Sequence, residues 1–261
     1  MNQALAPLDP GMIKLHRTGT GTPLVLLHCL GVDHGLWNIA AAGLEQSHTI
    51  LSYDFPGHHE AKLAPRPFTV EDLADQLAAV LTREKIDKAH VGGISLGGLV
   101  AQVFAARYPA RVDRLILMDT TARYTDEARE GWHQRAATAR TKGVPALIDN
   151  LLKIWFTDGF VAKNPAAAAY VRERFQKCSG EGYAMACECL AAADLRPRAA
   201  KITAPTLVVC GDEDVPAFQD AARWLAANIK GAKLEWLAPA RHASVLEQPA
   251  AFVAAMRKFL G

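Results

Sequence analysis

The stretch Gly93-Ile94-Ser95-Leu96-Gly97 decides the fold that this sequence favours, because of what stands on either side of it. A short apolar run at 90–92 precedes it and a helical pattern at 97–108 follows it, which predicts a strand, a tight turn and a helix. A serine in such a turn presents its hydroxyl at the end of the strand. The alternative is a plain glycine-rich turn, but the flanking elements favour Ser95 as a nucleophile.

Similar apolar runs bounded by turn residues recur along the chain, at 24–28, 50–53, 115–119, 206–210 and 233–237. Such runs are typical of buried parallel strands. Helical patterns alternate with them at 70–83, 218–229 and 249–260. The alternation predicts βαβ units and therefore an α/β fold.

The strand-like runs stop between residues 121 and 200, where alanine-rich and charged helical patterns take over. Glycines and a proline at Gly143, Gly159 and Pro165 divide this region into short helices. We therefore expect an α/β core formed by residues 1–120 and 201–261, with a helical cap at 121–200 inserted into it.

Composition and charge favour a globular enzyme and disfavour a nucleic-acid-binding or membrane protein. Hydrophobic residues make up 50% of the 261 residues, charged residues 21%, and the formal net charge is +2. This mix is typical of a globular enzyme, and no basic stripe indicates nucleic acid as a partner. The N-terminal residues do not resemble a secretion signal and no apolar stretch is long enough for a bilayer. We expect a cytoplasmic protein without membrane contacts, and a homo-oligomer is compatible with the sequence.

Cysteines and histidines give little sign of a metal or cofactor. The chain has five cysteines, an odd number without paired CxxC units, which indicates reduced thiols. Cys187 and Cys189 are interpreted as packing residues of a helix, and Cys29 likewise. The adjacent His58 and His59 point in different directions, which disfavours a shared metal. No cofactor and no metal are expected.

A serine needs a histidine within hydrogen-bond reach, and a carboxylate that orients this histidine, before it attacks a carbonyl at neutral pH. Asp212, Glu213 and Asp214 follow the predicted strand at 206–210, and His242 follows the last predicted strand. Both positions lie at the carboxyl edge of a parallel sheet, where ligands bind. The residue types alone do not separate the three carboxylates.

The negative charge that develops on an attacked carbonyl needs two backbone N–H groups, which together form an oxyanion hole. One comes from the residue after the nucleophile, Leu96, and the other from the loop after an early strand. That loop is His28-Cys29-Leu30-Gly31, and the second donor is assigned to Leu30, with Cys29 as the neighbouring alternative.

The order serine, acid, histidine resembles the α/β-hydrolase superfamily, and further motifs resemble its 3-oxoadipate enol-lactonase branch. These are Leu30-Gly31, Trp37, Tyr53-Asp54-Phe55-Pro56-Gly57-His58 and His242-Ala243-Ser244-Val245-Leu246-Glu247-Gln248-Pro249. The resemblance implies a mostly parallel eight-stranded sheet with helices on both faces and a helical cap. It also implies that the acid is Asp214, because the branch's Gly-x-x-Asp motif begins here at Gly211.

The expected cap is similar to that of the same branch at Thr121-Ala122-Arg123, Trp132, Trp155-Phe156-Thr157, Glu181-Gly182-Tyr183 and Asp194-Leu195-Arg196. The substrate of that branch carries a free carboxylate, which favours an arginine in the pocket. The residues predicted to contact substrate are Trp132, Trp155, Arg123 and Arg135, with Arg196 as a further candidate. The alternative for them is a structural or solvent-facing role in the helices.

The resemblance implies a serine hydrolase that cleaves a small lactone or ester through an acyl-enzyme, with 3-oxoadipate enol-lactone of aromatic catabolism as the expected substrate. Three loops depart from the branch's pattern: the one at His28, the one at His59, and the segment after Asp214. A broad-specificity carboxylesterase and a carbon–carbon bond hydrolase are the alternatives among enzymes. A binding protein without catalysis is the alternative outside them.

Overall fold

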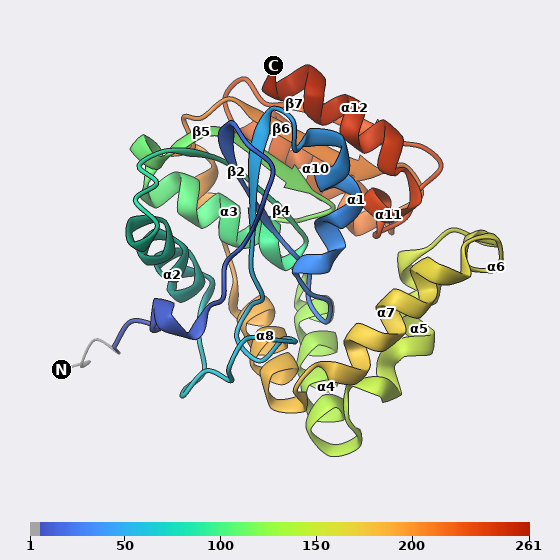
Figure 1. Cartoon of the computed structure of the whole chain (residues 1–261). Helices are drawn as coiled ribbons and strands as arrows, with labels where there is room; N and C mark the ends of the chain where they lie inside the picture. Colours follow the sequence, from blue (N-terminus) through green and yellow to red (C-terminus); the bar gives the residue numbers. More distant parts are fainter. Residues whose placement is uncertain (1–5) are drawn as a thin grey trace.

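The computed structural model describes residues 6–261. A seven-stranded sheet runs through its centre in the order β1-β3-β2-β4-β5-β6-β7 (Figure 1). Its strands are β1 (His16–Thr18), β2 (Thr22–Leu27), β3 (His48–Ser52), β4 (Ala89–Ile94), β5 (Val112–Met118), β6 (Thr206–Gly211) and β7 (Lys233–Leu237). Strand β1 pairs antiparallel with β3, and the remaining pairs are parallel.

The central strands β4 and β6 are buried along their whole length. This is why they appear in the sequence as continuous apolar runs rather than as alternating patterns. Their carboxyl ends lead directly into the loops that carry Ser95 and Asp214. The sheet thus brings residues that are distant in sequence to one edge.

Helices cover both faces of the sheet. Helices α2 (Val70–Arg83) and α3 (Leu96–Arg107) lie on one side of the strands, and α1 (Asn38–Leu44) and α12 (Pro249–Leu260) on the other (Figure 1). Helix α10 (Pro216–Asn228) packs against β6 and β7. The start of α2 is fixed by a capping box, in which Thr69 and Asp72 each accept a hydrogen bond from the other's backbone N–H.

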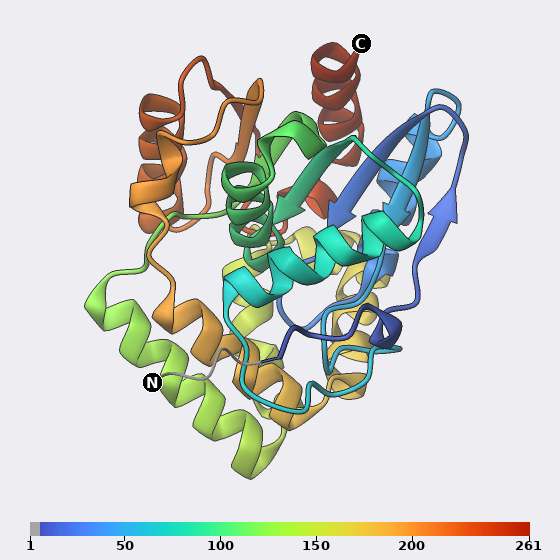
Figure 2. The same cartoon turned by 90° about the vertical axis from the view of Figure 1, so that its left-hand side faces the viewer.

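The chain between β5 and β6 forms a helical insertion. Its helices are α4 (Asp126–Lys142), α5 (Ile148–Trp155), α6 (Phe160–Lys163), α7 (Pro165–Lys177), α8 (Gly180–Ala192) and α9 (Arg196–Ala199). Helices α4 and α8 pack along each other, and the insertion lies below the carboxyl ends of the strands (Figure 2). Among the described helices, none combines the length and apolar character needed to span a bilayer.

The two ends of the insertion lie side by side. A β-bridge joins Arg123 to Asp194, and the N–H of Leu195 donates to the carbonyl of Ala122 over 2.7 Å. The inserted helices therefore leave and rejoin the sheet at one place, which allows them to cover its edge without interrupting the strand order.

The predicted α/β-hydrolase fold is confirmed, with a correction to the number of strands. Eight strands were expected and the described residues form seven. The segment before β1 contains Pro7 and Pro10, which have no N–H for a ladder, and it forms a short 3₁₀ helix at Pro10–Met12 instead. Strand β1 itself, His16-Arg17-Thr18, has no apolar residue and carried no strand signal.

Candidate active site

Ser95 lies in the turn between β4 and α3 with a backbone φ of 51° and ψ of −112°. Residues with side chains rarely adopt this conformation. It is held from two sides, because the Ser95 N–H donates to the carbonyl of Met118 (2.9 Å) and the Thr120 hydroxyl donates to the Ser95 carbonyl (2.8 Å). A Cβ on Gly93 would lie 2.2 Å from the backbone of Gly97, so the turn depends on glycine there.

His242 and Asp214 form a buried pair at the neighbouring strand ends. Nδ1 of His242 lies 2.9 Å from Oδ2 of Asp214, and the other carboxylate oxygen accepts the N–H of Val215 over 2.7 Å. Asp212 instead accepts the N–H of Ala240 (3.1 Å). Among the adjacent carboxylates, Asp214 is therefore the one in contact with the imidazole. Because Nδ1 faces Asp214, Nε2 is the atom available to accept a proton.

The electrostatic surroundings of His242 favour its charged form. Burial disfavours the imidazolium, but the charge of Asp214 and its hydrogen bond outweigh this and raise the pKa of His242 above its ordinary value. Arg135 acts in the opposite direction. A raised affinity for a proton is what an imidazole needs to take the proton of a serine hydroxyl and hold it while charge develops.

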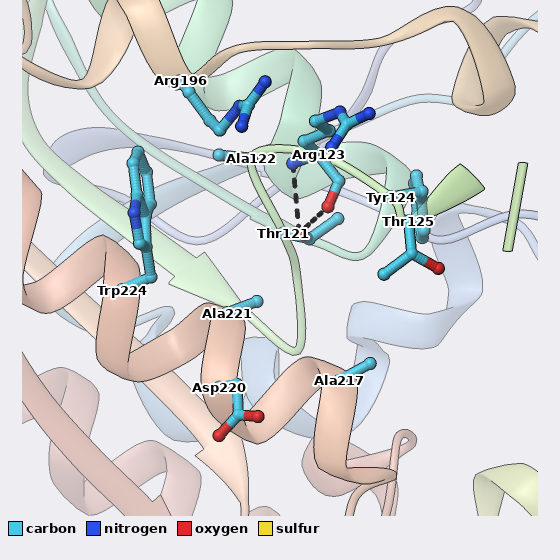
Figure 3. Close-up of a pocket in the computed structure, with 10 residues that line it drawn as sticks. All are labelled: Thr121, Ala122, Arg123, Tyr124, Thr125, Arg196, Ala217, Asp220, Ala221 and Trp224. Atoms are coloured by element: carbon cyan, nitrogen blue, oxygen red, sulfur yellow. Dashed lines mark hydrogen bonds between the residues drawn. The ribbon is translucent and has the colours of Figure 1, made fainter. Parts of the chain in front are cut away.

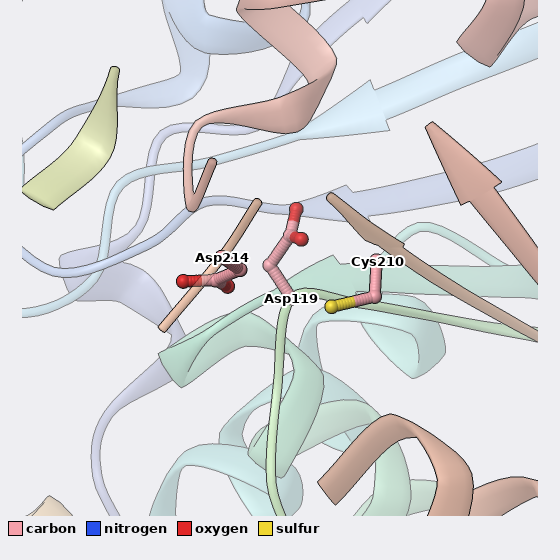
Figure 4. Close-up of side chains that lie close together, drawn as sticks. All are labelled: Asp119, Cys210 and Asp214. Carbon is pink, nitrogen blue, oxygen red and sulfur yellow. The ribbon is translucent and has the colours of Figure 1, made fainter. Parts of the chain in front are cut away.

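A second buried carboxyl, Asp119, lies beside this pair at the end of β5. Figure 4 shows it with Asp214 and Cys210, and one ligand atom from each of the three lies within 4.8 Å of the others. Asp119 accepts hydrogen bonds from the N–H of Gly211 (2.8 Å) and from the hydroxyl of Ser244. Burial and the charge of Asp214 raise the pKa of Asp119 to about 7.

The predicted oxyanion loop follows β2 and is locked by His28. The buried ring accepts the N–H of Phe55 at Nε2 (2.9 Å), so Nδ1 carries the hydrogen and donates it to the carbonyl of Cys29 (2.7 Å). Burial lowers the pKa of His28, which is consistent with this neutral form. Among the described residues, the N–H groups of Leu30 and Leu96 donate to no protein acceptor, so both are available to a ligand oxygen.

The next residue of this loop, Gly31, contacts the insertion. Its φ is 88°, and a Cβ there would lie 2.5 Å from the ring of Phe175 in α7. Phe175 packs in turn against Trp155 with 5.6 Å between the ring centroids. The insertion therefore holds the oxyanion loop from outside.

Ser95 and His242 line one cavity of about 60 Å³ between the sheet edge and the insertion. The complete lining is Leu30, Ser95, Trp132, Arg135, Leu151, Ile154, Trp155, Phe218 and His242. Three of the four residues predicted to contact substrate, Trp132, Trp155 and Arg135, are thus in the same cavity as the serine.

Arg135 is the cationic member of the cavity. Its guanidinium carbon lies 4.2 Å from the centroid of the Trp132 ring, and one terminal nitrogen donates to the hydroxyl of Tyr183 (2.7 Å). Its Nε is buried without a hydrogen-bond partner among the described residues. A buried N–H without a partner is costly, so this group is ready to bind an anionic ligand.

The fourth predicted residue, Arg123, lies elsewhere. It lines a separate hollow of about 300 Å³ together with Arg196 and Trp224 (Figure 3). Both arginines are paired with carboxylates there: Arg123 with Asp126 (2.8 Å) and Arg196 with Asp194 (2.6 Å). This larger hollow contains neither Ser95 nor His242, so we do not regard it as the place of the chemistry.

Several residues near the serine were missed in the sequence. Phe218, in the first turn of α10, has its ring centroid 4.3 Å from that of His242. Leu151 and Ile154 line the cavity from α5. Tyr124 is buried against Trp132 and Phe218, which line the same cavity. Isolated aromatic and aliphatic residues in helices normally indicate packing, so no motif distinguished them.

The five cysteines do not line the cavity that contains Ser95, and Cys210 lies beside Asp214 and Asp119 behind it. All five are unpaired and buried. Burial raises the pKa of the Cys29 thiol far above its usual range, so it is not a thiolate at neutral pH.

Comparison with known proteins shows the family of the chain. The family described as alpha/beta hydrolase fold matches residues 22–249. The chain belongs to the α/β-hydrolase family. Among curated members, a 3-oxoadipate enol-lactonase of Acinetobacter baylyi is 31% identical over 88% of this chain and 85% of its own length. A pimeloyl-[acyl-carrier protein] methyl ester esterase of Chromobacterium violaceum is also 31% identical, over 93% of this chain and 95% of its own.

Similar solved structures of the α/β-hydrolase family likewise include a lactonase and an esterase. The enol-lactonase from Burkholderia xenovorans superimposes with a TM-score of 0.91 at 35% identity, covering 95% of this chain and 96% of the other. A thermophilic esterase from Thermogutta terrifontis gives a TM-score of 0.90 at 27% identity, covering 95% and 92%. The relatives of this hydrolase thus include lactonases and esterases.

Proposed function

We propose that this α/β-hydrolase is a cytoplasmic serine hydrolase that opens the ring of 3-oxoadipate enol-lactone in the catabolism of aromatic compounds. The observation that carries the proposal is one cavity lined by Ser95, His242 and the cationic Arg135. The substrate combines a lactone carbonyl with a carboxylate. It therefore needs a nucleophile and a cation in the same small pocket.

Ring opening begins with transfer of the Ser95 proton to Nε2 of His242. The serine oxygen bonds to the lactone carbonyl carbon, and the carbonyl oxygen takes the negative charge, which the N–H groups of Leu30 and Leu96 stabilise. Asp214 holds the imidazole in the required tautomer and stabilises its positive charge.

The ring carbon–oxygen bond then breaks, and His242 returns the proton to the departing enol oxygen. The enol becomes a ketone, while the carbonyl carbon remains bound to Ser95 as an ester. Water attacks this acyl-enzyme with His242 as the base, and Ser95 leaves with its proton restored. No step of this reaction requires a cofactor or a metal.

Arg135 is the residue that we assign to the substrate carboxylate, in preference to Arg123. Arg135 lines the cavity and, among the described residues, its buried Nε has no hydrogen-bond partner. Arg123 pairs with Asp126 and lines the separate hollow. A guanidinium can donate two parallel hydrogen bonds to a carboxylate, which orients the lactone as well as binding it.

The test compares 3-oxoadipate enol-lactone with phenyl acetate, an ester that has no carboxylate. We expect Arg135→Gln to raise KM for the lactone by about 10- to 100-fold, as expected for loss of a charged hydrogen bond, and to leave phenyl acetate hydrolysis unchanged. Arg123→Gln is the matched control and should alter neither substrate. Absence of lactone turnover by the wild type would overturn the proposal, as would a KM effect at Arg123 instead of Arg135.

The second candidate is a broad-specificity carboxylesterase. The similarity to a methyl ester esterase at 31% identity favours it. Under this alternative, simple esters without a carboxylate are turned over with higher kcat/KM than the lactone, and Arg135→Gln affects both to the same extent.

A further inference from the structure

A hollow that the catalytic scheme does not use adjoins the cavity of Ser95 and His242. It measures about 210 Å³, and we call it the outer hollow. Its lining is Thr121, Arg123, Tyr124, Thr125, Ala128, Ala217, Phe218 and Asp220. Most of these residues also line the hollow that contains Trp224 (Figure 3), so the two hollows lie next to each other.

Phe218 is the one residue that lines both the catalytic cavity and the outer hollow. It stands in the first turn of α10, where its N–H donates to the carbonyl of Val215 over 2.9 Å. Its side chain is half-buried. At this point the two spaces are therefore separated by the thickness of one side chain.

A second pair of rings meets along the same boundary. Tyr124 lines the outer hollow, Trp132 lines the catalytic cavity, and their rings pack edge-on with 5.3 Å between the centroids. The ring of Tyr124 also packs edge-on against that of Phe218, with 6.2 Å between the centroids. Aromatic rings in contact with one another thus form the boundary, and Phe218 is the ring that borders each space.

The space on the catalytic side of this boundary is small. It measures about 60 Å³, whereas ligand pockets commonly measure about 300–1,000 Å³. Protein interiors are closely packed, so a substituent that extends beyond the cavity meets side-chain atoms rather than free space. The residues that bound the cavity consequently decide which substituents fit.

The contact between Phe218 and His242 indicates which part of a substrate meets this boundary. The centroids of the two rings lie 4.3 Å apart, and both residues line the cavity. The leaving oxygen must lie within reach of the histidine that protonates it, whereas the carbonyl oxygen points toward the N–H groups of the oxyanion hole. The leaving group is therefore the part of the substrate closest to Phe218.

We propose that Phe218 determines the size of the leaving group, because its ring closes the catalytic cavity against the outer hollow. A compact leaving group fits, as does one that remains attached to the acyl part in a lactone. Long alkyl alcohols are excluded. A smaller side chain at this position joins the two spaces and gives a long alcohol room in the outer hollow. The inference rests on the proposed serine mechanism but not on the identity of the lactone.

The test uses methyl, butyl and hexyl acetate, which differ only in the leaving alcohol. We expect kcat/KM of the wild type to fall along this series and that of Phe218→Ala to rise, because each methylene buried in the outer hollow contributes about two- to fourfold. The ratio of kcat/KM for hexyl acetate to that for methyl acetate should exceed the wild-type ratio by at least about 30-fold. This ratio cancels any loss of rate that the two esters share.

Ile154→Ala is the matched control. Ile154 lines the catalytic cavity from α5 and does not line the outer hollow, so its truncation enlarges the cavity without joining the two spaces. The hexyl-to-methyl ratio of this variant should stay close to that of the wild type. Methyl esters of acetic, butyric and hexanoic acid lengthen the acyl group instead, and Phe218→Ala should show no comparable gain along that series.

A second substitution tests whether the alcohol occupies the outer hollow. Ala128 is exposed and lines this hollow at the start of α4. Ala128→Trp adds a large side chain there, and in the Phe218→Ala background it should abolish the gain for hexyl acetate.

Four results would overturn the proposal: an unchanged ratio in folded Phe218→Ala, an equal gain along the acyl series, an equal gain in Ile154→Ala, or a gain that survives Ala128→Trp. Circular dichroism checks folding, and Phe218→Leu, for which we expect a smaller gain, takes the place of Phe218→Ala if that variant does not fold. If the wild type cleaves methyl acetate but not the enol-lactone, the lactonase proposal fails and the role of Phe218 is still measured. If the wild type cleaves neither esters nor the lactone, both proposals fail.

Discussion

Nδ1 of His242 lies 2.9 Å from Oδ2 of Asp214, and both side chains are buried at adjoining strand ends. This contact joins residues that are 28 positions apart in the chain. It determines both the tautomer of the imidazole and its affinity for a proton.

The first prediction concerns the pH dependence of kcat/KM. His242 must be neutral to take the serine proton, and Asp214 raises its pKa above the ordinary value of about 6.5, so kcat/KM should rise with pH through a midpoint above that value. Asp214→Asn should move the midpoint to lower pH and reduce the plateau about 10³- to 10⁴-fold. Asp212→Asn, the neighbouring carboxylate, should leave the profile unchanged; a shift there instead would contradict the assignment.

The second prediction concerns Asp119 and stability. Its pKa is raised to about 7 in the folded protein, so the stabilisation present at low pH is lost as pH rises through that value. Asp119→Asn cannot ionise and can still accept the N–H of Gly211. Its free energy of unfolding relative to wild type should therefore increase by about 2–4 kcal/mol between about pH 4 and about pH 8. Urea denaturation at a series of pH values measures this difference. A difference in the free energy of unfolding that does not change with pH would refute the prediction.

The third prediction concerns the turn at Ser95. A Cβ on Gly93 would lie 2.2 Å from backbone atoms of Gly97, so Gly93→Ala should cost about 1–3 kcal/mol in the free energy of unfolding and most of the activity. Gly131 in α4 is the control, since nothing lies within 4 Å of its added Cβ. Gly131→Ala should stabilise by about 0.5–1 kcal/mol. Equal effects in thermal unfolding would contradict the proposed crowding.

The fourth prediction concerns how the insertion is fastened to the core. Asp33 is buried and contacts two residues of α7: the Tyr170 hydroxyl donates to it over 2.7 Å, and Arg174 pairs with it at 3.0 Å. Arg174→Met leaves this carboxylate undercompensated and should cost about 1–3 kcal/mol. Arg172→Met, two positions away, removes an exposed pair with Asp149 and should cost less than about 0.5 kcal/mol. Chemical denaturation measures both losses in the free energy of unfolding. A larger loss for Arg172→Met than for Arg174→Met would show that the contact between Asp33 and Arg174 does not hold the insertion on the core.

The elements of the core could be predicted from sequence because their patterns are strong. The expected helices at 70–83 and 249–260 coincide with α2 and α12, and six of the seven strands lie within a few residues of the apolar runs. The two helices are buried on one face with a helical period, and the central strands are buried continuously, so their residue types report their structure directly. Strand β1 and helix α1 are short and have weak patterns, and they were not anticipated.

The site could be predicted less completely. Ser95 and His242 stand out by position, but Asp212 and Asp214 have equivalent chemistry and differ only in where the loop directs them. Arg123 and Arg135 likewise look alike in sequence. Arg123 lies before α4, in the bridge to Asp194 and outside the cavity, whereas Arg135 lies in α4 and lines it. Phe218 and Asp119 are near the serine only because β4, β5 and β6 are adjacent in the sheet, a relation between distant segments that no local pattern contains.

The nucleophilic role of Ser95 is the central claim, and one measurement tests it most directly. Initial rates of wild type and Ser95→Ala are compared on 3-oxoadipate enol-lactone and phenyl acetate at saturating substrate. We expect the variant to lose activity on every substrate that the wild type cleaves, by at least about 10³-fold, as when a catalytic triad loses its nucleophile. A Ser95→Ala variant that retains the wild-type rate would contradict the account.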